Sequence, residues 1–247
     1  MMIVAAAQTI PKRKNTTENL EDHYRLVNLA ADHGAQLIVF PEMSLTGYER
    51  EFAAELSFVG NDMRLDKLKN LASNRNIIIL AGAPILLESG LHIGMFVLEP
   101  NQPERIYTKQ YLHDGEEIAF VPGINRDILI NLEGEVISLA ICADITNPAH
   151  PARAAALNST LYIASIFYTP NGIQQGFSDL QGYANLFYMS VLMSNFGGMS
   201  YSMQAAGQSS FWNNNGKIIS GFEGAGEGLL IVEKNDKDWK STVLETT

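Results

Sequence analysis

Hydrophobic and polar positions alternate along this chain in short blocks that predict strands and helices in turn. Runs of aliphatic residues bounded by Gly, Pro, Asn or Asp are typical of buried strands. Such runs occupy residues 2–8, 36–40, 77–81, 94–98, 106–109, 127–132, 135–142, 161–167, 191–195, 217–221 and 229–232. Apolar residues recur at helical spacing in residues 15–34, 62–71, 148–157 and 180–188. This order of elements predicts an α/β protein.

The signals at the ends of these blocks agree with them. Asn15, with Glu18 three residues later, forms a capping box at the start of the first predicted helix. Glu133-Gly134 and Asn213–Gly216 predict hairpin turns, and Phe167–Gln175 is expected to be a loop. We find no linker, repeat or low-complexity segment, so residues 1–247 are expected to form a single compact domain.

The composition narrows the class of protein. The 247 residues are 46% hydrophobic and 18% charged, which is typical of a globular protein with a sizeable core. The formal net charge of −10 and the lack of a basic stripe argue against nucleic acid or an anionic membrane as partner. No apolar run approaches the roughly 18 residues that cross a bilayer, and the N-terminal run has no basic leader. We therefore expect a cytoplasmic location.

The single cysteine, Cys142, ends a predicted buried strand. One thiol cannot form an internal disulfide, which leaves packing or reactivity as its use and fits a reducing compartment. Taken alone, a cysteine with apolar neighbours is most often a small core residue. The end of a strand, however, is where α/β enzymes place their reactive groups.

Two more polar residues follow predicted strands in the same way. Glu42 comes after Phe40-Pro41, and Lys109 comes after Thr108. If these strand ends converge on Cys142, the carboxylate can take the thiol proton and the ammonium can stabilise both a thiolate and an oxyanion. Such a set defines acyl-transfer chemistry. Separately, Glu42 could cap a loop, and Lys109 could be a solvated residue at the end of a strand.

The segments around these residues resemble the signature segments of the carbon–nitrogen hydrolases, the nitrilase superfamily. The resemblance is carried by Phe40-Pro41-Glu42 with Thr46-Gly47-Tyr48, by Tyr107–Leu112 and by Ile141–Asp144. It covers residues 2–233 and leaves residues 234–247 as a short C-terminal tail. It implies that Glu42, Lys109 and Cys142 form the catalytic set. It also implies that Glu116, six residues before Pro122-Gly123, is a further functional glutamate.

The resemblance also implies a fold and partners. Members form a four-layer αββα sandwich and commonly pair into homodimers or larger homo-oligomers. The residues alone do not distinguish that sandwich from a doubly wound sheet. The substrate class implied is a small linear amide or an N-carbamoyl compound, and the chemistry requires no metal and no organic cofactor.

The mechanism that the resemblance implies proceeds through a thioester. Glu42 removes the proton of Cys142, and the thiolate attacks the amide carbon. Lys109 and the backbone N–H of Ala143 stabilise the oxyanion, a contribution of roughly 3 kcal/mol for one such donor. Glu42 then protonates the leaving amine or ammonia and activates the water that hydrolyses the thioester, while Glu116 orients Lys109 or the substrate.

Residues near the three segments carry weaker signals. Tyr48, Phe167 and Tyr168 are candidates to line the pocket, although they could equally fill the core. Asp144 is expected to bond the backbone around the cysteine turn rather than to act as a catalyst. His113 and His150 receive no role.

The chain departs from the family pattern beside the cysteine, where Ala143 replaces the usual aromatic residue and Pro148-Ala149 replaces a Pro-Glu pair. These changes affect the pocket wall more than the chemistry. Three alternatives stay open: nitrile hydrolysis at the same site, a metal-dependent phosphoesterase, and a catalytically silent protein that binds a metabolite. The phosphoesterase needs several Asp, Asn and His ligands, and the sequence offers few.

Overall fold

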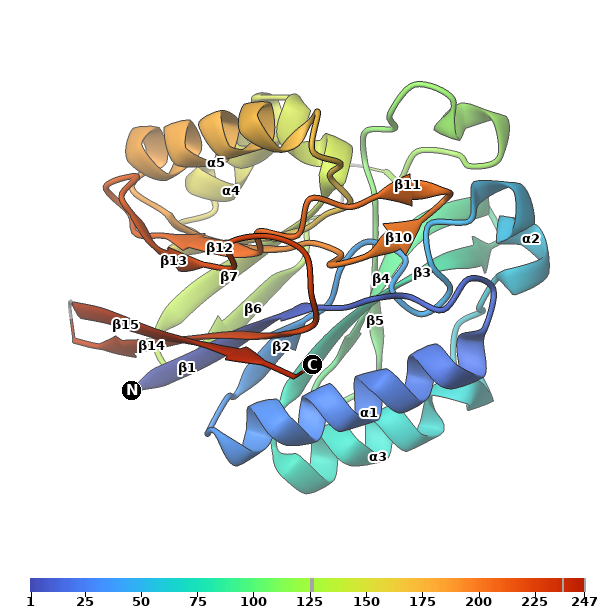
Figure 1. Cartoon of the computed structure of the whole chain (residues 1–247), viewed down its shortest axis with the longest axis horizontal. Helices are drawn as coiled ribbons and strands as arrows, with labels where there is room; N and C mark the ends of the chain where they lie inside the picture. The colour runs from blue at the N-terminus through green and yellow to red at the C-terminus, as the bar shows by residue number, and fades with distance from the viewer. Residues whose placement is uncertain (125–126, 237, 247) are drawn as a thin grey trace.

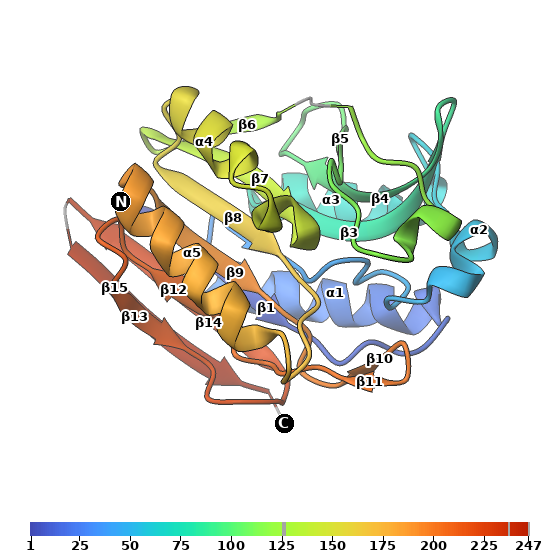
Figure 2. The same cartoon turned by 90° about the horizontal axis from the view of Figure 1, so that it is seen from above.

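The chain forms a layered structure in which two sheets lie face to face between helices (Figure 1). The computed structural model describes residues 1–124, 127–236 and 238–246. Seen from above, the layers lie one behind another, with the helices of residues 149–187 nearest the viewer and those of residues 16–75 behind the sheets (Figure 2). The expected αββα sandwich in a single domain is therefore confirmed.

The first sheet has the strand order β15-β14-β1-β2-β3-β4-β5. The strands β1, β2 and β3 are parallel, and the remaining neighbours in this sheet are antiparallel. Its strands are β1 (Met2–Gln8), β2 (Leu37–Val39), β3 (Ile78–Leu87), β4 (Gly90–Leu98), β5 (Arg105–Thr108), β14 (Gly228–Asn235) and β15 (Asp238–Glu245).

The second sheet has the order β13-β12-β9-β8-β7-β6, with β7, β8 and β9 parallel. Its strands are β6 (Leu129–Leu132), β7 (Glu135–Ile141), β8 (Leu161–Ser165), β9 (Ser190–Ser194), β12 (Ser210–Trp212) and β13 (Ile218–Gly221). A small separate ribbon pairs β10 (Met199–Ser200) with β11 (Met203–Gln204).

Helices cover the outer face of each sheet. Helices α1 (Thr16–Asp32) and α3 (Asp66–Arg75) lie on the first sheet, and α4 (Ala149–Ala156) and α5 (Ile173–Phe187) lie on the second (Figure 1). The short elements are α2 (Ala53–Leu56), η1 (Arg50–Phe52), η2 (Met63–Leu65), η3 (Glu116–Ile118) and η4 (Cys142–Thr146). The predicted cap is present, since the side chain of Asn15 accepts a hydrogen bond from the Glu18 N–H.

The alternation of side chains along β1 explains why this strand is apolar from Met2 to Ala7. Val4 and Ala6 belong to the core between the sheets, whereas Ala5 and Ala7 pack in the core beneath α1 and α3. Because successive residues of a strand point to opposite faces, a central strand of a sandwich with helices outside needs apolar residues at every position.

Serine side chains join the two sheets at the ends of parallel strands. The hydroxyl of Ser165, at the end of β8, donates to the Phe40 carbonyl at 2.8 Å, and that of Ser194, at the end of β9, donates to the Ala7 carbonyl at 2.6 Å. These bonds fix the carboxyl ends of β1 and β2 against those of β8 and β9. The residues that follow these strand ends are thereby held at one place in the sandwich.

Two sequence predictions about elements were wrong. The expected C-terminal tail, residues 234–247, instead contains β15, which pairs with β14 from Gly228 to Asn235 and extends the first sheet. Residues 173–175, expected in a loop, form the first turn of α5. That helix includes Gly176, a weak helix former, because a Cβ there would collide with the ring of Tyr168.

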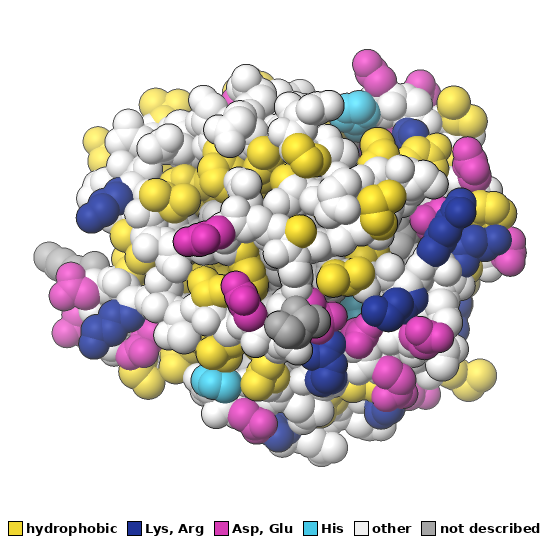
Figure 3. Space-filling view, in the orientation of Figure 1, with side chains coloured by type: hydrophobic (Ala, Val, Ile, Leu, Met, Phe, Trp, Pro, Cys, Tyr) yellow, Lys and Arg dark blue, Asp and Glu magenta, His cyan; other side chains and the backbone are white. Residues whose placement is uncertain are grey.

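The surface of the described residues agrees with the composition. On the face shown in Figure 3, Lys and Arg side chains are interspersed with Asp and Glu side chains and do not gather into a basic stripe. Among the described helices, none combines the length and apolar character needed to cross a bilayer.

Candidate active site

Glu42 lies in a tight turn directly after β2. A Cβ at position 82 in the neighbouring strand β3 would lie 2.5 Å from the Met43 nitrogen and 2.9 Å from the Pro41 carbonyl oxygen, so glycine is required there. The Leu45 N–H donates to the Gly82 carbonyl at 3.0 Å. Met43 has a φ of 53°, an uncommon conformation for a residue with a side chain. The turn therefore has one well-defined position, and it buries Glu42 almost completely.

Lys109 follows β5 and reaches the same place from the edge of the first sheet. Its side chain is fully buried, and its Nζ lies 2.7 Å from Oε1 of Glu42 and 2.7 Å from Oε1 of Glu116. A buried ammonium is unfavourable unless it is paired, and here two carboxylates pair with it. The contact with Glu42 joins residues that are 67 positions apart in sequence, and the contact with Glu116 joins residues that are 7 positions apart.

Glu116 begins η3 and is held on both oxygens. Oε1 accepts hydrogen bonds from Lys109 and from the phenol of Tyr48, and Oε2 accepts one from the His113 N–H at 2.8 Å. The preceding residue, Gly115, has a φ of 85°, which favours glycine at the turn into η3. Glu116, which was predicted from its spacing to Pro122-Gly123, is thus part of the buried charge cluster.

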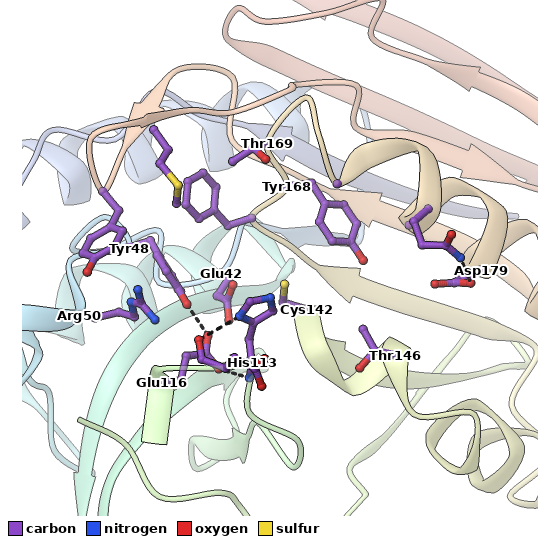
Figure 4. Close-up of a pocket in the computed structure, with 17 residues that line it drawn as sticks. Glu42, Tyr48, Arg50, His113, Glu116, Cys142, Thr146, Tyr168, Thr169 and Asp179 are labelled. Carbon is purple, nitrogen blue, oxygen red and sulfur yellow. Dashed lines mark hydrogen bonds between the residues drawn. The ribbon is translucent and has the colours of Figure 1, made fainter. Parts of the chain in front are cut away.

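Cys142 stands where β7 becomes η4. Its φ is 40°, which is unfavourable for any residue with a Cβ. Such strain is retained where the surrounding structure fixes it, and it is frequent at reactive positions. The side chain is 9% exposed, enough to line the cavity that also contains Glu42 and Glu116 (Figure 4). The carboxylate and the ammonium are therefore placed beside the one sulfhydryl of the chain.

Asp144 fixes this turn, in the structural role that the sequence suggested. Its Oδ1 accepts from the N–H groups of Gln110 and Tyr111 at 2.8 and 2.9 Å. Its Oδ2 accepts from the Ile141 N–H at 2.9 Å and from the Tyr107 phenol at 2.6 Å. One buried carboxylate thus connects the cysteine turn with the segment that carries Lys109.

The electrostatics of the cluster follow from two carboxylates sharing one ammonium. Burial is the main reason why the pKa of Glu42 rises to about 7, and the nearby charge of Glu116 adds to this effect against the attraction of Lys109. For Lys109, burial alone would lower the pKa, but the attraction of Glu42 and the other acidic groups outweighs it and the pKa is raised. Lys109 therefore keeps its positive charge.

The thiol is neutral in this environment. Burial, followed by the charge of Glu42, raises the pKa of Cys142 above its ordinary value, and the attraction of Lys109 opposes this only in part. A neutral thiol beside a carboxylate with a pKa near 7 is an arrangement that can transfer a proton when a substrate enters. The thiol of Cys142 is therefore held in its protonated form.

The cavity above the sulfur has a volume of about 520 Å³ and is rich in aromatic rings. Tyr48, Phe167 and Tyr168, the pocket candidates from the sequence, all line it, together with Tyr201. Ala143 is buried in η4 behind Cys142 and is not among the lining residues. The size suits a small molecule.

Several lining residues were not predicted from the sequence. Arg50 lies two positions after Tyr48, just beyond one of the signature segments, and its charge was a usable signal. Thr146 lies in η4, Asp179 lies in α5, and Tyr201 and Met203 lie in or next to the β10–β11 ribbon. The packing of distant elements brings these residues to the cavity, and no local sequence pattern predicts that packing.

The two histidines without a predicted role are accounted for by the structure. His150 is buried between two phenols, with its ring nitrogens 2.8 Å from the Tyr107 and Tyr162 oxygens. His113 is exposed at the rim of the cavity. In the part of the chain that the structure describes, no group of three His, Cys, Asp or Glu side chains is arranged to hold a metal ion.

Comparisons with known proteins relate this geometry to a family. The family model described as carbon–nitrogen hydrolase matches residues 3–242. The chain is 28% identical over 240 residues to a protein of Pseudomonas protegens described as "Hydrolase in pqqF 5'region", covering 93% of this chain and 81% of that protein. It is 26% identical over 181 residues to the glutamine-dependent NAD(+) synthetase of Thermotoga maritima, covering 68% of this chain. The match spans only 30% of that synthetase's length.

A solved structure shows the same fold. The NitN amidase of Nesterenkonia sp. AN1 superposes with a TM-score of 0.86 at 23% identity, covering 96% of this chain and 94% of the amidase. Variants of that amidase have been solved in complex with butyramide and with the acetamide moiety of fluoroacetamide added covalently at the active-site cysteine.

Proposed function

The chain belongs to the carbon–nitrogen hydrolase family, and from this premise we propose that it hydrolyses a small linear amide through a thioester on Cys142. The observation that carries the proposal is the buried contact of Lys109 with Glu42 and Glu116, at 2.7 Å each, beside the single thiol. A base, a nucleophile and a fixed cation are the groups that acyl transfer requires.

In the first half of the reaction, Glu42 accepts the proton of Cys142 and the sulfur bonds to the amide carbon. The negative charge that develops on the carbonyl oxygen is stabilised by Lys109 and by the backbone N–H of Ala143. Collapse of this intermediate breaks the carbon–nitrogen bond, and Glu42 returns the proton to the leaving nitrogen. The products of this half are a thioester on Cys142 and free ammonia or amine.

In the second half, a water molecule replaces the departed amine. Glu42 takes a proton from the water, the hydroxide attacks the thioester carbon, and the sulfur leaves as the thiolate. The proton returns to the sulfur, and the carboxylic acid is released. Glu116 serves as a positioning residue, because it binds the same Nζ of Lys109 as Glu42 does and restrains Tyr48.

The cavity supports a small substrate in this proposal. About 520 Å³ lined by aromatic rings accommodates a short acyl group and its amide. The complex of the Nesterenkonia amidase with butyramide makes short aliphatic amides the first compounds to test. N-carbamoyl compounds are the second class, and nitriles are the third. Homodimer formation and a cytoplasmic location stay predictions from the sequence.

The test measures ammonia release from a panel of short amides, carbamoyl compounds and nitriles, with intact-mass analysis of the enzyme during turnover. We expect turnover of an amide and a transient mass increase equal to its acyl group. Cys142→Ala is expected to abolish both signals, and full activity in this variant contradicts the proposal. Hydrolysis of a phosphate ester that a metal chelator abolishes supports the phosphoesterase alternative instead. Binding of an amide without turnover supports the silent binding protein.

A further inference from the structure

Arg50 stands out among the residues around the cavity. It is the first residue of η1, two positions after Tyr48, and its side chain is the only Lys or Arg among the described residues that line the cavity. Lys109 lies deeper, where its charge is taken up by Glu42 and Glu116. Arg50 therefore supplies the accessible positive charge of the pocket.

Two carboxylates near Arg50, those of Glu49 and Glu116, are already engaged. Glu49 pairs with Arg13 at 2.9 Å and accepts the Tyr201 N–H at 3.3 Å. Glu116 is bonded through both oxygens, as described above. Within the described residues, Arg50 has no carboxylate within ion-pair distance, and its buried Nε has no hydrogen-bond partner. A buried donor without a partner is unfavourable, so the position favours an acceptor supplied from outside the chain.

Aromatic rings hold the guanidinium in place. Its central carbon lies 4.6 Å from the centre of the Tyr201 ring and 5.6 Å from that of Tyr48. Gly115 leaves room for it, because a Cβ there would lie 3.3 Å from Nη1. A guanidinium that is already oriented by stacking loses little freedom when it binds a carboxylate, and its planar fork matches the two oxygens.

The charged groups of the pocket are separated by position. In Figure 4, Arg50 lies at one end with Tyr48 and Glu116, whose charge is shared with Lys109, Asp179 lies at the opposite end, and Glu42 with Cys142 lies between them. Asp114, also in the lining, is exposed at the rim. An anionic group on a bound molecule is attracted to the Arg50 end and repelled from the Asp179 end.

We propose that Arg50 binds a carboxylate of the substrate, so that the preferred substrates are small amides that carry a free carboxylate in addition to the amide. The inference rests on the proposed function, since it assumes that the amide carbon lies at Cys142. Arg50 then determines specificity and takes no part in bond cleavage. The carboxylate belongs either to the acyl group, as in succinamate and glutaramate, or to the leaving amine, as in N-carbamoyl-β-alanine.

The test compares substrates of equal carbon number with and without the carboxylate: succinamate with butyramide, and glutaramate with valeramide. We expect the wild type to prefer the carboxylates. Arg50→Gln is expected to lower kcat/KM for them by about 10- to 100-fold, the equivalent of a charged hydrogen bond, and to change the neutral amides far less. Those neutral amides also report whether the variant is folded. N-carbamoyl-β-alanine compared with propylurea shows whether the carboxylate sits on the leaving side.

The matched control is Arg75→Gln, which removes the same charge from α3, where Arg75 pairs with Asp32. We expect this variant to behave as wild type toward every substrate. Equal loss for acidic and neutral amides in Arg50→Gln, or equal wild-type rates for both, overturns the inference and leaves the proposed function intact.

A measurement without turnover separates the two proposals further. In Cys142→Ala, calorimetry is expected to detect glutaramate more tightly bound than valeramide, and adding Arg50→Gln is expected to remove that difference. If glutaramate shows no advantage in binding, the inference about Arg50 is wrong even where amides are hydrolysed. If the wild type turns over none of the amides and Cys142→Ala binds none of them, both proposals fail.

Discussion

The phenol of Tyr107 donates a 2.6 Å hydrogen bond to Oδ2 of Asp144, and this contact joins the strand before Lys109 to the turn that carries Cys142. Because the same carboxylate also binds the N–H groups of Gln110, Tyr111 and Ile141, the two segments cannot move independently. The distance between the Cys142 thiol and the Lys109 ammonium is therefore constrained by Asp144, which is not among the lining residues of the cavity.

Replacing Asp144 with Asn is expected to disturb this connection. The amide keeps one acceptor oxygen and places a donor against the remaining buried donors, so at least one buried group loses its partner. We expect the free energy of unfolding to fall by about 2–4 kcal/mol, as measured by urea titration. We also expect kcat/KM to fall, because the position of Cys142 relative to Lys109 becomes less defined.

Ser138→Ala supplies the control for a purely structural effect. Ser138 is buried in β7, the strand that leads to Cys142, and its hydroxyl bonds Ser159. This variant is expected to lose about 1 kcal/mol of stability with unchanged activity in the folded fraction. If Asp144→Asn likewise keeps full activity in its folded fraction, Asp144 does not position the site.

The pH dependence of the reaction is expected to report on Glu42. Only the ionised carboxylate can accept the thiol proton, and the pKa of Glu42 is raised to about 7, chiefly by burial. We therefore expect kcat/KM to decline as the pH falls below about 7. The charge of Glu116 contributes to this shift, so Glu116→Gln is expected to move the decline to lower pH. An unchanged profile in that variant contradicts this account of the electrostatics.

The thiol itself offers a separate measurement. Since Cys142 is the only cysteine, the pH dependence of its alkylation by iodoacetamide reports the thiolate fraction without interference from another thiol. Burial and the charge of Glu42 both raise the pKa of Cys142. Glu42→Gln is therefore expected to lower that pKa while it abolishes amide hydrolysis. Lys109→Met removes an attractive charge and is expected to raise it. A shift in the same direction for both variants means that the two charges do not act on the sulfur as the geometry indicates.

The strand ends were predictable because their sequence signals are local and strong. Residues 2–7 are apolar at every position, as burial on both faces requires, and the predicted strand 2–8 has the same bounds as β1 in the structure. The turns after β2 and β7 carry Glu42 and Cys142, whose residue types already suggest chemistry. That these ends meet follows from sheet order and from cross-sheet bonds such as Ser165 to Phe40, which no local pattern encodes.

The rest depends on contacts between distant segments. Gly176 weakens the helical pattern of α5 in the sequence. Glycine is needed there because the ring of Tyr168 packs against it. Tyr201 enters the pocket from the turn between β10 and β11, strands of two residues each that are too short to show periodicity. That Arg50 is available to bind a substrate follows only from the tertiary structure, in which the neighbouring Glu49 pairs with Arg13.

The backbone at Cys142 makes a prediction about stability. A φ of 40° is unfavourable for Ala and free of strain for Gly. We expect Cys142→Gly to exceed Cys142→Ala in the free energy of unfolding by about 1 kcal/mol, measured by urea titration. Ala143, which is not among the residues of positive φ, gives the matched control: there, replacing Ala with Gly is expected to reduce stability by a similar amount. If Ala is more stable than Gly at position 142 as well as at position 143, the backbone of the turn relaxes when the sulfur is removed.

His23 is expected to make folding sensitive to acid. Its Nδ1 lies 2.6 Å from the Asn19 carbonyl and its Nε2 lies 2.9 Å from the Ser44 hydroxyl, two residues beyond Glu42. Burial lowers its pKa from 6.5 to about 4. Between pH 6.5 and 4, His23 is protonated in the unfolded chain and neutral in the folded protein. The free energy of unfolding therefore falls by about 3 kcal/mol as the pH is lowered from 6.5 to 4. His23→Phe cannot titrate, and comparing it with the wild type cancels the opposite contribution of Glu42. The difference between their unfolding free energies is expected to vary by this amount across the window, and a constant difference shows that His23 is protonated in the fold.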